Sequence, residues 1–332
     1  MPGVASRNLG KRSVIIGAGI GGLAAGAAVA PFFDEVVIID KDELPSTAQQ
    51  RRGVAQGQHI HVLLKGGETF LESLLPGIRN DFLAADACEI SDTENLLHFE
   101  RGHWFPRRDL GYTHLCLSRP AYERVLRERV RRIANVTIRD RESVEALVIE
   151  DDKVTGVSGK SGRRPFTEGV DLCVFAGGRS GILSRMLAQA GRGEIPTTTL
   201  SIEVHYATGR FKKPNRYRDD AKHVVCFPEP PQAALGLLVP VENDEWLIAL
   251  GGRLEQRPPI DLAGFRNYAH RCPLSKSPTV CAMRSPSSPF APIASDHRHG
   301  GTTINTPTCR TGSFPLATAL QVTIRLSHRA CR

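Results

Sequence analysis

The chain has 332 residues, 41% of them hydrophobic, and a formal net charge of +8. This length accommodates a large core and a second subdomain, and no apolar run reaches the roughly 18 unbroken residues that a membrane span requires. The segment Pro273–Arg332 contains seven Lys or Arg residues and one acid, so it alone contributes +6, and the rest of the chain is nearly balanced. Because no apolar run is long enough for a membrane span, we expect a soluble, cytoplasmic protein. Because no basic face with interleaved aromatic residues is evident, we expect no nucleic-acid partner.

The segment Arg12–Ala30, RSVIIGAGIGGLAAGAAVA, fits two incompatible interpretations. A basic start, an apolar run and a closing Ala-Val-Ala are typical of a secretory signal peptide. The same segment contains Gly-x-Gly-x-x-Gly at Gly17, Gly19 and Gly22. These glycines lie between a β-branched run and an Ala-rich, helix-forming run, as in a dinucleotide-binding turn.

The next segment, Glu35–Asp40, decides between the two interpretations. Its four apolar residues bounded by charge predict a second strand buried on both faces, which completes a strand–turn–helix–strand unit. Asp40 lies roughly 20 residues beyond the glycines, where a carboxylate can accept the ribose hydroxyls of an adenine dinucleotide. A signal peptide predicts none of these features, so we favour dinucleotide binding.

Within this unit the three glycines have separate predicted roles. Gly17 permits the tight turn, Gly19 lets the backbone approach a pyrophosphate, and Gly22 lets the helix pack close to the strand. The N-terminus of the helix adds free N–H groups and a partial positive charge. A glycine-rich helix start that binds no ligand is the alternative.

The stretch RRGVAQGQHIHVLL, residues 51–64, resembles a known family. It is similar to the segment after the second strand in FAD-dependent monooxygenases and epoxidase-like relatives with the para-hydroxybenzoate hydroxylase fold. In that family an arginine here lies near the phosphate and ribityl groups of the flavin. The resemblance implies this role for Arg51 or Arg52, and we favour Arg52 because it directly precedes Gly53. A solvated pair of loop arginines is the alternative.

Two histidines in the same stretch, His59 and His61, are candidate metal ligands. On a strand, His59 and His61 would point to one face, as in a zinc site. No third ligand occurs at a diagnostic spacing, and none of the eight cysteines forms a Cys-x-x-Cys pair. We therefore expect structural histidines, reduced core cysteines and no metal.

The stretch from Ser118 to Ile133 predicts an amphipathic helix. Ser118 is a suitable N-cap, Pro120 is tolerated in the first turn, and apolar residues recur at helical spacing. Arg119, at the start of this helix, resembles an arginine that flavin monooxygenases carry close to the cofactor.

A second glycine turn follows a meander of short strands between Asn135 and Val157. The stretch Leu172–Ala176 predicts a buried strand that leads through Gly177 into a helix. In the family, an Ala-(Thr/Ser/Gly)-Gly turn at this place closes over the FAD from the opposite side. Asp171, Ala176 and Gly177 match it, and this second match favours FAD over NAD.

Three regions are predicted from these patterns. We expect a Rossmann-like α/β FAD-binding domain with inserted segments over 1–195 and a mostly antiparallel, β-rich substrate domain over 196–270. The second domain includes a hairpin around Asn243-Asp244 and a helix capped by Asp261. Residues 271–332 form an aberrant, disordered or frameshifted tail.

The resemblance implies an FAD-dependent monooxygenase that acts on a small organic substrate. External NAD(P)H would reduce the flavin, and O₂ would form a flavin C4a-hydroperoxide that hydroxylates or epoxidises the substrate. A flavin-dependent reductase or halogenase on the same fold is the alternative, although the halogenase lysine signature is not evident. No catalytic side chain can be named.

The tail lacks a further motif of the family, Gly-Asp followed by Asn-Pro and Gln-Gly-Met. No Gly-Asp occurs after residue 230. Regrouping possible codons of PLATALQVTIRLSHRAC, Pro315–Cys331, in a shifted frame permits this motif in register. We therefore predict a frameshift near residues 270–285, with a non-catalytic product as the alternative of another class. Reading the coding DNA tests this prediction, and a shifted frame without the Gly-Asp motif would refute it.

Overall fold

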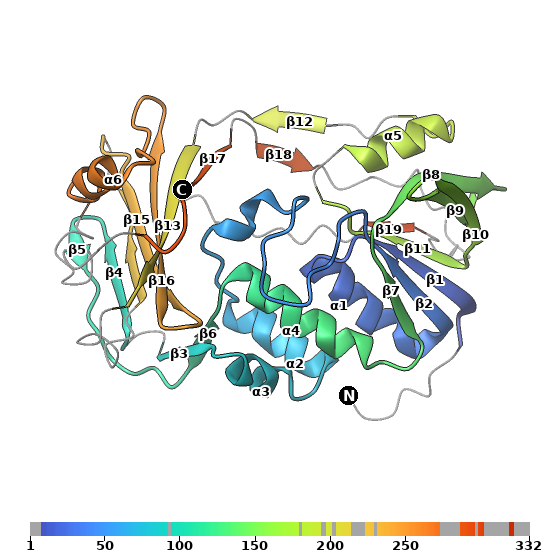
Figure 1. Cartoon of the computed structure of the whole chain (residues 1–332), viewed down its shortest axis with the longest axis horizontal. Coiled ribbons are helices and arrows are strands. Elements are labelled where there is room, and N and C mark those ends of the chain that lie inside the picture. Colours follow the sequence, from blue (N-terminus) through green and yellow to red (C-terminus); the bar gives the residue numbers. More distant parts are fainter. Residues whose placement is uncertain are drawn as a thin grey trace, which may run out of the picture.

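The computed structural model describes residues 8–91, 94–178, 181–193, 197–200, 204–213, 223–228, 231–272, 286–295, 298–301 and 319–321. Figure 1 shows two bodies, one built on a parallel sheet flanked by helices and one built on a second, larger sheet. Among these residues, none of the helices is long and apolar enough to cross a membrane.

The first body is built mainly from residues before 193. Its helices are α1 (Ile20–Val29), α2 (Lys65–Leu74), α3 (Ile78–Ala84), α4 (Arg119–Arg131) and α5 (Ile182–Gln189), with 3₁₀ turns η1 (Ala30–Phe32) and η2 (Ala55–Gln58). Its strands are β1 (Gly10–Ile16), β2 (Phe33–Ile39), β3 (Cys88–Ser91), β6 (Thr113–Cys116), β7 (Val136–Arg139), β8 (Glu142–Glu150), β9 (Lys153–Ser161), β10 (Arg164–Gly169) and β11 (Leu172–Phe175).

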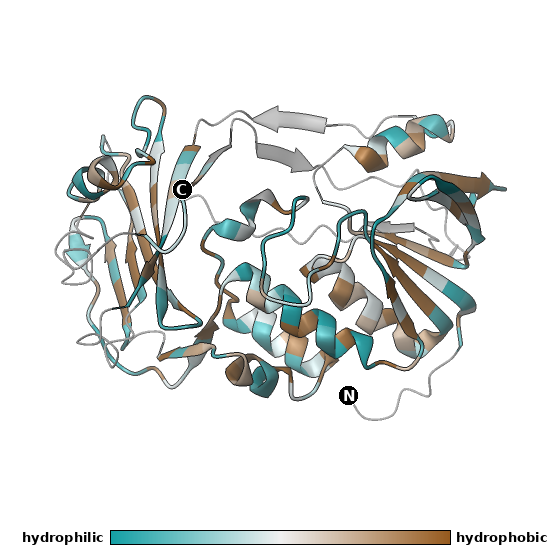
Figure 2. Cartoon of the chain, in the orientation of Figure 1, coloured by the Kyte–Doolittle hydropathy of each residue, from teal (hydrophilic) through white to brown (hydrophobic). Residues whose placement is uncertain are grey.

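The parallel sheet has the order β19-β11-β1-β2-β7, in which β19 is Ala319–Gln321. The carboxyl ends of β1, β2 and β11 lie side by side, because Ile16 pairs with both Ile39 and Phe175. Figure 2 shows β1 and β2 as hydrophobic in their carboxyl-terminal halves, which are VII in β1 and VVII in β2. The segment Arg12–Ala30 thus forms a central strand and a packed helix, which confirms the dinucleotide-type unit rather than a signal peptide.

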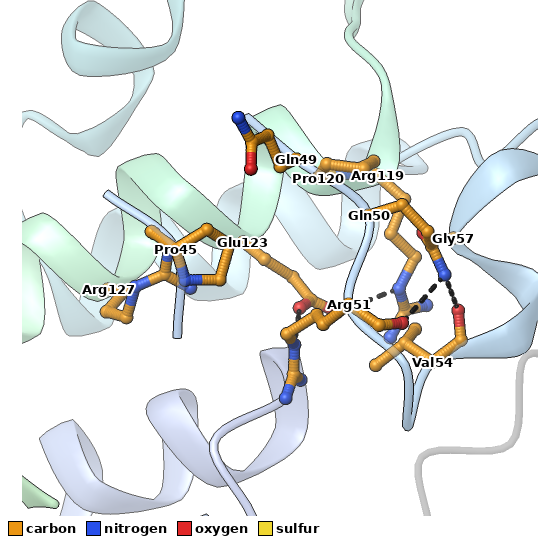
Figure 3. Close-up of a pocket in the computed structure, with 10 residues that line it drawn as sticks. All are labelled: Pro45, Gln49, Gln50, Arg51, Val54, Gly57, Arg119, Pro120, Glu123 and Arg127. Carbon is orange, nitrogen blue, oxygen red and sulfur yellow. Dashed lines mark hydrogen bonds and ion pairs between the residues drawn. The ribbon is translucent and has the colours of Figure 1, made fainter. Parts of the chain in front are cut away.

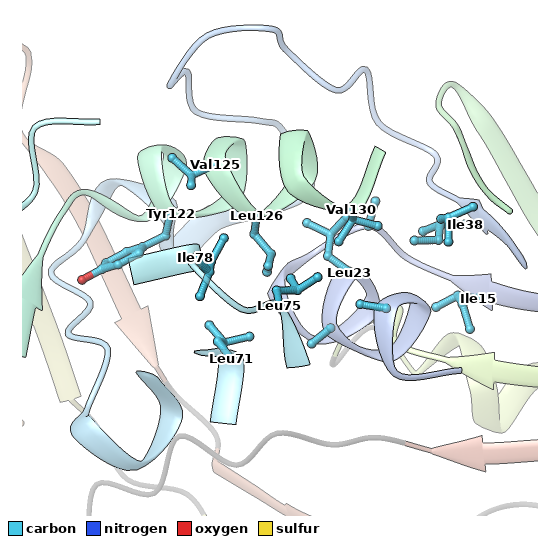
Figure 4. Packing of buried hydrophobic residues seen from close by; sticks show 14 of the residues in the cluster. Ile15, Leu23, Ile38, Leu71, Leu75, Ile78, Tyr122, Val125, Leu126 and Val130 are labelled. Carbon is cyan, nitrogen blue, oxygen red and sulfur yellow. The ribbon is translucent and has the colours of Figure 1, made fainter. Parts of the chain in front are cut away.

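Two cores cover the two faces of this sheet. On one face, α1, α2, α3 and α4 bury a cluster that includes Leu23, Leu71 and Leu126 (Figure 4). On the other face, β8, β9, β10 and α5 bury a second cluster that includes Val14, Val157 and Met186. The alternate side chains of β1 contribute to opposite faces, as expected for a strand buried on both sides.

The second body is a seven-stranded sheet with the order β17-β13-β16-β15-β14-β4-β5. Its strands are β4 (Leu96–Glu100), β5 (His103–Trp104), β13 (Val204–Lys212), β14 (His223–Cys226), β15 (Leu235–Val241), β16 (Glu245–Arg253) and β17 (Ala291–Ser295). Helix α6 (Leu262–Ala269) packs on it, and Asp261 caps this helix as predicted, accepting the Gly264 N–H at 2.8 Å. The predicted hairpin turn is present, with positive φ at Asn243 and Asp244.

This sheet extends beyond the predicted boundaries of 196–270. It takes β4 and β5 from an inserted segment of the first region and β17 from the predicted tail. The tail also contributes β18 (Arg298–Gly301), paired with β12 (Thr197–Leu200), and β19. Most of the remaining tail, including most of Pro315–Cys331, lies outside the described residues.

The start of α4 is tied to the second body. Ser118 caps the helix as predicted, since its hydroxyl accepts the Ala121 N–H at 3.4 Å. The Ser118 N–H also donates to the buried carboxylate of Glu242, at 2.8 Å, and its hydroxyl donates to the same group. The helix cap is therefore completed by a residue 124 positions away, in the hairpin that joins β15 to β16.

Candidate functional site

The three glycines of the first turn occupy three different environments. Gly17 has φ +103°, a conformation that favours glycine, and a Cβ there would lie 2.6 Å from the Ala176 carbonyl oxygen. A Cβ on Gly22 would collide with the Gly17 carbonyl. Gly19 has an ordinary φ of −75°, and a Cβ there would meet only Arg51 Nη2, at 3.7 Å. Gly17 and Gly22 are thus required by the fold, whereas the space over Gly19 is open.

The second glycine turn packs directly against the first. The Ala176 N–H donates to the Ile16 carbonyl at 2.8 Å, and a Cβ on Gly17 would lie 3.2 Å from the Gly177 Cα. Asp171, at the other end of β11, accepts the N–H groups of Lys11 and Arg12 at 2.7 and 2.9 Å, so it fixes β1 beside β11. The Arg179 and Ser180 positions, which follow this turn, lie outside the described residues.

Asp40 closes the site at the end of β2. Its Oδ2 accepts the Ala18 N–H of the glycine turn at 2.6 Å, and its Oδ1 accepts the Asp42 N–H at 2.9 Å. The side chain is buried. The carboxylate therefore lies beside the glycine turn, as the spacing of the two motifs predicts.

Arg51 is the centre of a buried ion-pair network. Its Nη1 lies 3.1 Å from Asp40 Oδ2 and 3.4 Å from Asp42 Oδ2, and its Nε lies 3.0 Å from Glu123 Oε2. Burial disfavours the charged form, but Glu123 and Asp40 raise the pKa of Arg51 above its ordinary value. The guanidinium is thus a fixed positive charge beside Gly19.

Glu123 also holds the second arginine. Its Oε1 lies 3.0 Å from the Nε of Arg119, one turn earlier on α4 (Figure 3). Arg52, in contrast, is exposed. The structure therefore brings together Gly19, Asp40, Arg51 and Arg119, and it leaves Arg52 outside this group.

A pocket between Arg51 and Arg119 is nearly filled. It is lined by Gln50, Arg51, Arg119 and Glu123, among others, and holds a cavity of about 10 Å³, which is roughly the space of one water molecule. Neither Gly19 nor Asp40 is among the residues that line this pocket.

Glu123 was not predicted from the sequence. It is one of several acidic residues on the polar face of a helix, and the sequence predicts that such residues are exposed to solvent. Its partner Arg51 is 72 residues away. A weak signal was present, because Glu123 follows Arg119 by four residues and can pair with it along the helix.

His59 contacts the second sheet through its imidazole ring. The stretch that contains it is not a strand, and its Nδ1 lies 2.7 Å from the Thr208 hydroxyl of the second sheet. The Nδ1 of His61 lies 3.0 Å from the His59 carbonyl oxygen. The prediction of a local structural role for these two histidines therefore agrees with their contacts.

We expect acid to weaken the fold through His59. Burial and the nearby His61 lower the pKa of His59 from 6.5 to about 4. The unfolded chain therefore binds a proton that the folded chain does not, and stability present above pH 6.5 is lost progressively as the pH falls toward 4. Urea unfolding at pH 7 and at pH 5 measures how much free energy of unfolding is lost between the two pH values. This loss should be smaller for His59→Gln than for the unaltered chain. The same substitution at the exposed His103 should leave the loss unchanged, and equal losses in all three proteins would contradict this assignment.

The site fits the diphosphate of a dinucleotide by three observations. The first helical bond of α1 runs from the Leu23 N–H to the Gly19 carbonyl, so the N–H groups of the first turn have no acceptor within the helix. Among the described residues, no side chain caps this turn and no acid lies in it. A positive guanidinium lies within reach of the same space. Such a site favours an anionic group.

The sequence of the chain is similar to that of a curated protein. No protein-family model matches the chain. Protein Rv3254 of Mycobacterium tuberculosis is 28% identical over 293 residues, which cover 82% of this chain and 60% of that protein. The chain thus spans about 60% of the length of this curated relative.

Solved structures are similar over most of the chain. The flavin-dependent brominase Bmp2 matches with a TM-score of 0.64 and 15% identity, over 87% of this chain and 68% of that one. PqsL, a probable FAD-dependent monooxygenase from Pseudomonas aeruginosa, matches with a TM-score of 0.62 and 14% identity, over 86% of this chain and 73% of that one. The chain has the fold of the FAD-dependent monooxygenases and halogenases. The predicted fold class is therefore confirmed.

Proposed function

We propose that this chain is an FAD-dependent oxidoreductase, and specifically a monooxygenase that acts on a small organic substrate. The observation that carries the proposal is the open space over Gly19, at the N-terminus of α1 and beside the Arg51 guanidinium, which pairs with Asp40. Similarity to flavin-dependent proteins supports FAD as the dinucleotide.

Each residue of the site has a proposed task toward FAD. The α1 turn and Gly19 would hold the pyrophosphate, and Asp40 would accept the ribose hydroxyls. Arg51 would leave Asp40 and turn toward the phosphates, exchanging a carboxylate partner for a phosphate partner. Glu123 limits that movement, because it holds Arg51 through Nε and Arg119 at the same time.

The bound flavin would supply the redox chemistry, with NAD(P)H as reductant and O₂ as oxidant. This chain's contribution is to orient the flavin and to exclude water from it. The seven-stranded sheet supports the substrate assignment, since it forms a second body beside the site and PqsL has been solved with 2-aminobenzoylacetate. We place the protein in the cytoplasm, where the thiols of Cys173 and Cys226, which form no disulfide, are stable.

Halogenation is the second candidate. Bmp2 and the myxobacterial chondrochloren halogenase CndH share the fold, CndH over 94% of this chain. Supplying reduced FAD, O₂ and bromide to the protein with an electron-rich aromatic compound separates the two reactions. A brominated product supports halogenation, and a hydroxylated product supports monooxygenation.

The first test is a titration with FAD, followed by absorbance and by flavin fluorescence. The proposal expects saturable binding of one FAD per chain and, once FAD is bound, NAD(P)H oxidation with O₂ uptake. If FAD binds but NAD(P)H is not oxidised, the assignment of the FAD site stands and the assignment of monooxygenase activity is rejected. The absence of any binding would reject both.

We expect Asp40→Asn to weaken FAD binding by about 1 to 3 kcal/mol, the range for hydrogen bonds to a charged group. The amide oxygen can still accept the Ala18 N–H, so the turn should keep its shape. Isothermal titration with FAD measures the loss. Glu43→Gln, which removes an exposed carboxylate nearby, is the matched control. Equal affinities in the two variants would exclude Asp40 from the ribose site.

A further inference from the structure

Two histidines and a cysteine converge in the interior, away from the glycine turns. His114 and Cys116 are two residues apart on β6, so their side chains lie on one face of the strand. His223 begins β14 in the seven-stranded sheet. All three are buried, and their ligand atoms lie within 4.8 Å of one another.

The distances suit a single metal ion. His223 Nδ1 lies 3.3 Å from His114 Nε2. Two imidazole nitrogens bound to one tetrahedral zinc ion at about 2.0–2.1 Å would be separated by about 3.3 Å. A thiolate in the same site would lie about 3.5 Å from each nitrogen. The ligand atoms now lie within 4.8 Å of one another, so the side chains need to close by about 1.3 Å at most.

The chemistry of the cluster points to a thiophilic ion. All three side chains are almost completely shielded from water, with exposures of 3% for His114, 0% for Cys116 and 6% for His223. Ile90 and Val239 pack with Cys116 in an apolar cluster. In such surroundings a thiol is a weak hydrogen-bond partner for imidazole, whereas a thiolate with two imidazoles is a typical set for Zn²⁺ or Cu⁺.

We propose that His114, Cys116 and His223 bind one thiophilic closed-shell cation, Zn²⁺ or Cu⁺. The ion would join β6 of the first body to β14 of the second. Cys116 is two residues before Ser118, the N-cap of α4, so the ion would also fix the start of the helix that carries Arg119 and Glu123. This proposal does not depend on FAD binding.

Metal content tests the proposal directly. Untagged protein from cells grown with added zinc, or with added copper under reducing conditions, should retain one equivalent of one of these ions after purification without chelators. Cys116→Ala and His223→Ala should each weaken binding at least 100-fold in competition with a chromophoric chelator. Cys226→Ala, which changes another buried cysteine three positions from His223 and on the opposite face of β14, should bind as the unaltered chain does.

X-ray absorption at the metal edge is measured on the unaltered protein, so it tests the proposal even if a variant fails to fold. The unaltered protein should show one sulfur at about 2.3 Å and two imidazole nitrogens at about 2.0–2.1 Å. A first shell without sulfur would overturn the proposal. So would metal-free protein from both supplemented cultures, or metal retention in Cys116→Ala that equals retention in Cys226→Ala.

Discussion

The Gly19→Val chain should fold normally and lose FAD binding by about 100-fold or more, which corresponds to about 2.7 kcal/mol. Gly19 has an ordinary φ, and a Cβ there would meet only Arg51 Nη2, at 3.7 Å, so a side chain at this position causes no collision with the backbone. The valine side chain would instead occupy the space that we assign to the pyrophosphate. Circular dichroism and thermal unfolding check the fold, and an FAD titration checks the site.

Two other glycines make this result interpretable. Gly66, in the first turn of α2, also has open space around it, so Gly66→Val should alter neither the fold nor FAD affinity. Gly22→Val should prevent folding, because its Cβ would collide with the Gly17 carbonyl. If Gly19→Val folds and binds FAD as tightly as Gly66→Val does, the pyrophosphate does not lie over Gly19.

Arg51→Met should lower the free energy of unfolding by about 3–5 kcal/mol, the cost of removing one partner from a buried ion pair. The substitution leaves Asp40, Asp42 and Glu123 without the guanidinium that joins them. The side chain of Arg51 is only 6% exposed, so in the variant little water can reach the three carboxylates to solvate them. Urea denaturation at neutral pH measures the change.

Arg52→Met is the matched control, since Arg52 is an exposed neighbour of the same type. It should change the free energy of unfolding by less than about 0.5 kcal/mol. FAD titration of the folded fraction of both variants tests which arginine serves the cofactor, and we expect the larger loss for Arg51→Met. Similar stabilities and affinities in the two variants would show that the ion-pair network has neither role.

Local patterns in the sequence were sufficient to predict the elements that begin and end within a few residues. Ser118 and Asp261 cap helices because a cap needs only a side chain and an N–H two or three residues later. The Asn243-Asp244 turn forms because both residues tolerate a positive φ. The glycine turn was predictable for the same reason.

Features that depend on distant partners were not predictable. Arg51 and Arg52 are adjacent and chemically identical, and which of them turns inward is decided by Asp40, 11 residues away, and by Glu123. The pairing of β4 with β14 joins an inserted segment to the second sheet. His114 and His223 are separated by 109 positions, so no spacing rule could connect them.

The contact between Ser118 and Glu242 limits how this protein can be divided. A fragment that ended at residue 195 would contain α4 but not the carboxylate that completes its N-terminus, and the Thr208 partner of His59 would be missing as well. Each region therefore takes part of its buried hydrogen bonding from the other. We expect that engineering this scaffold by recombination will succeed only where both sides of these contacts are exchanged together.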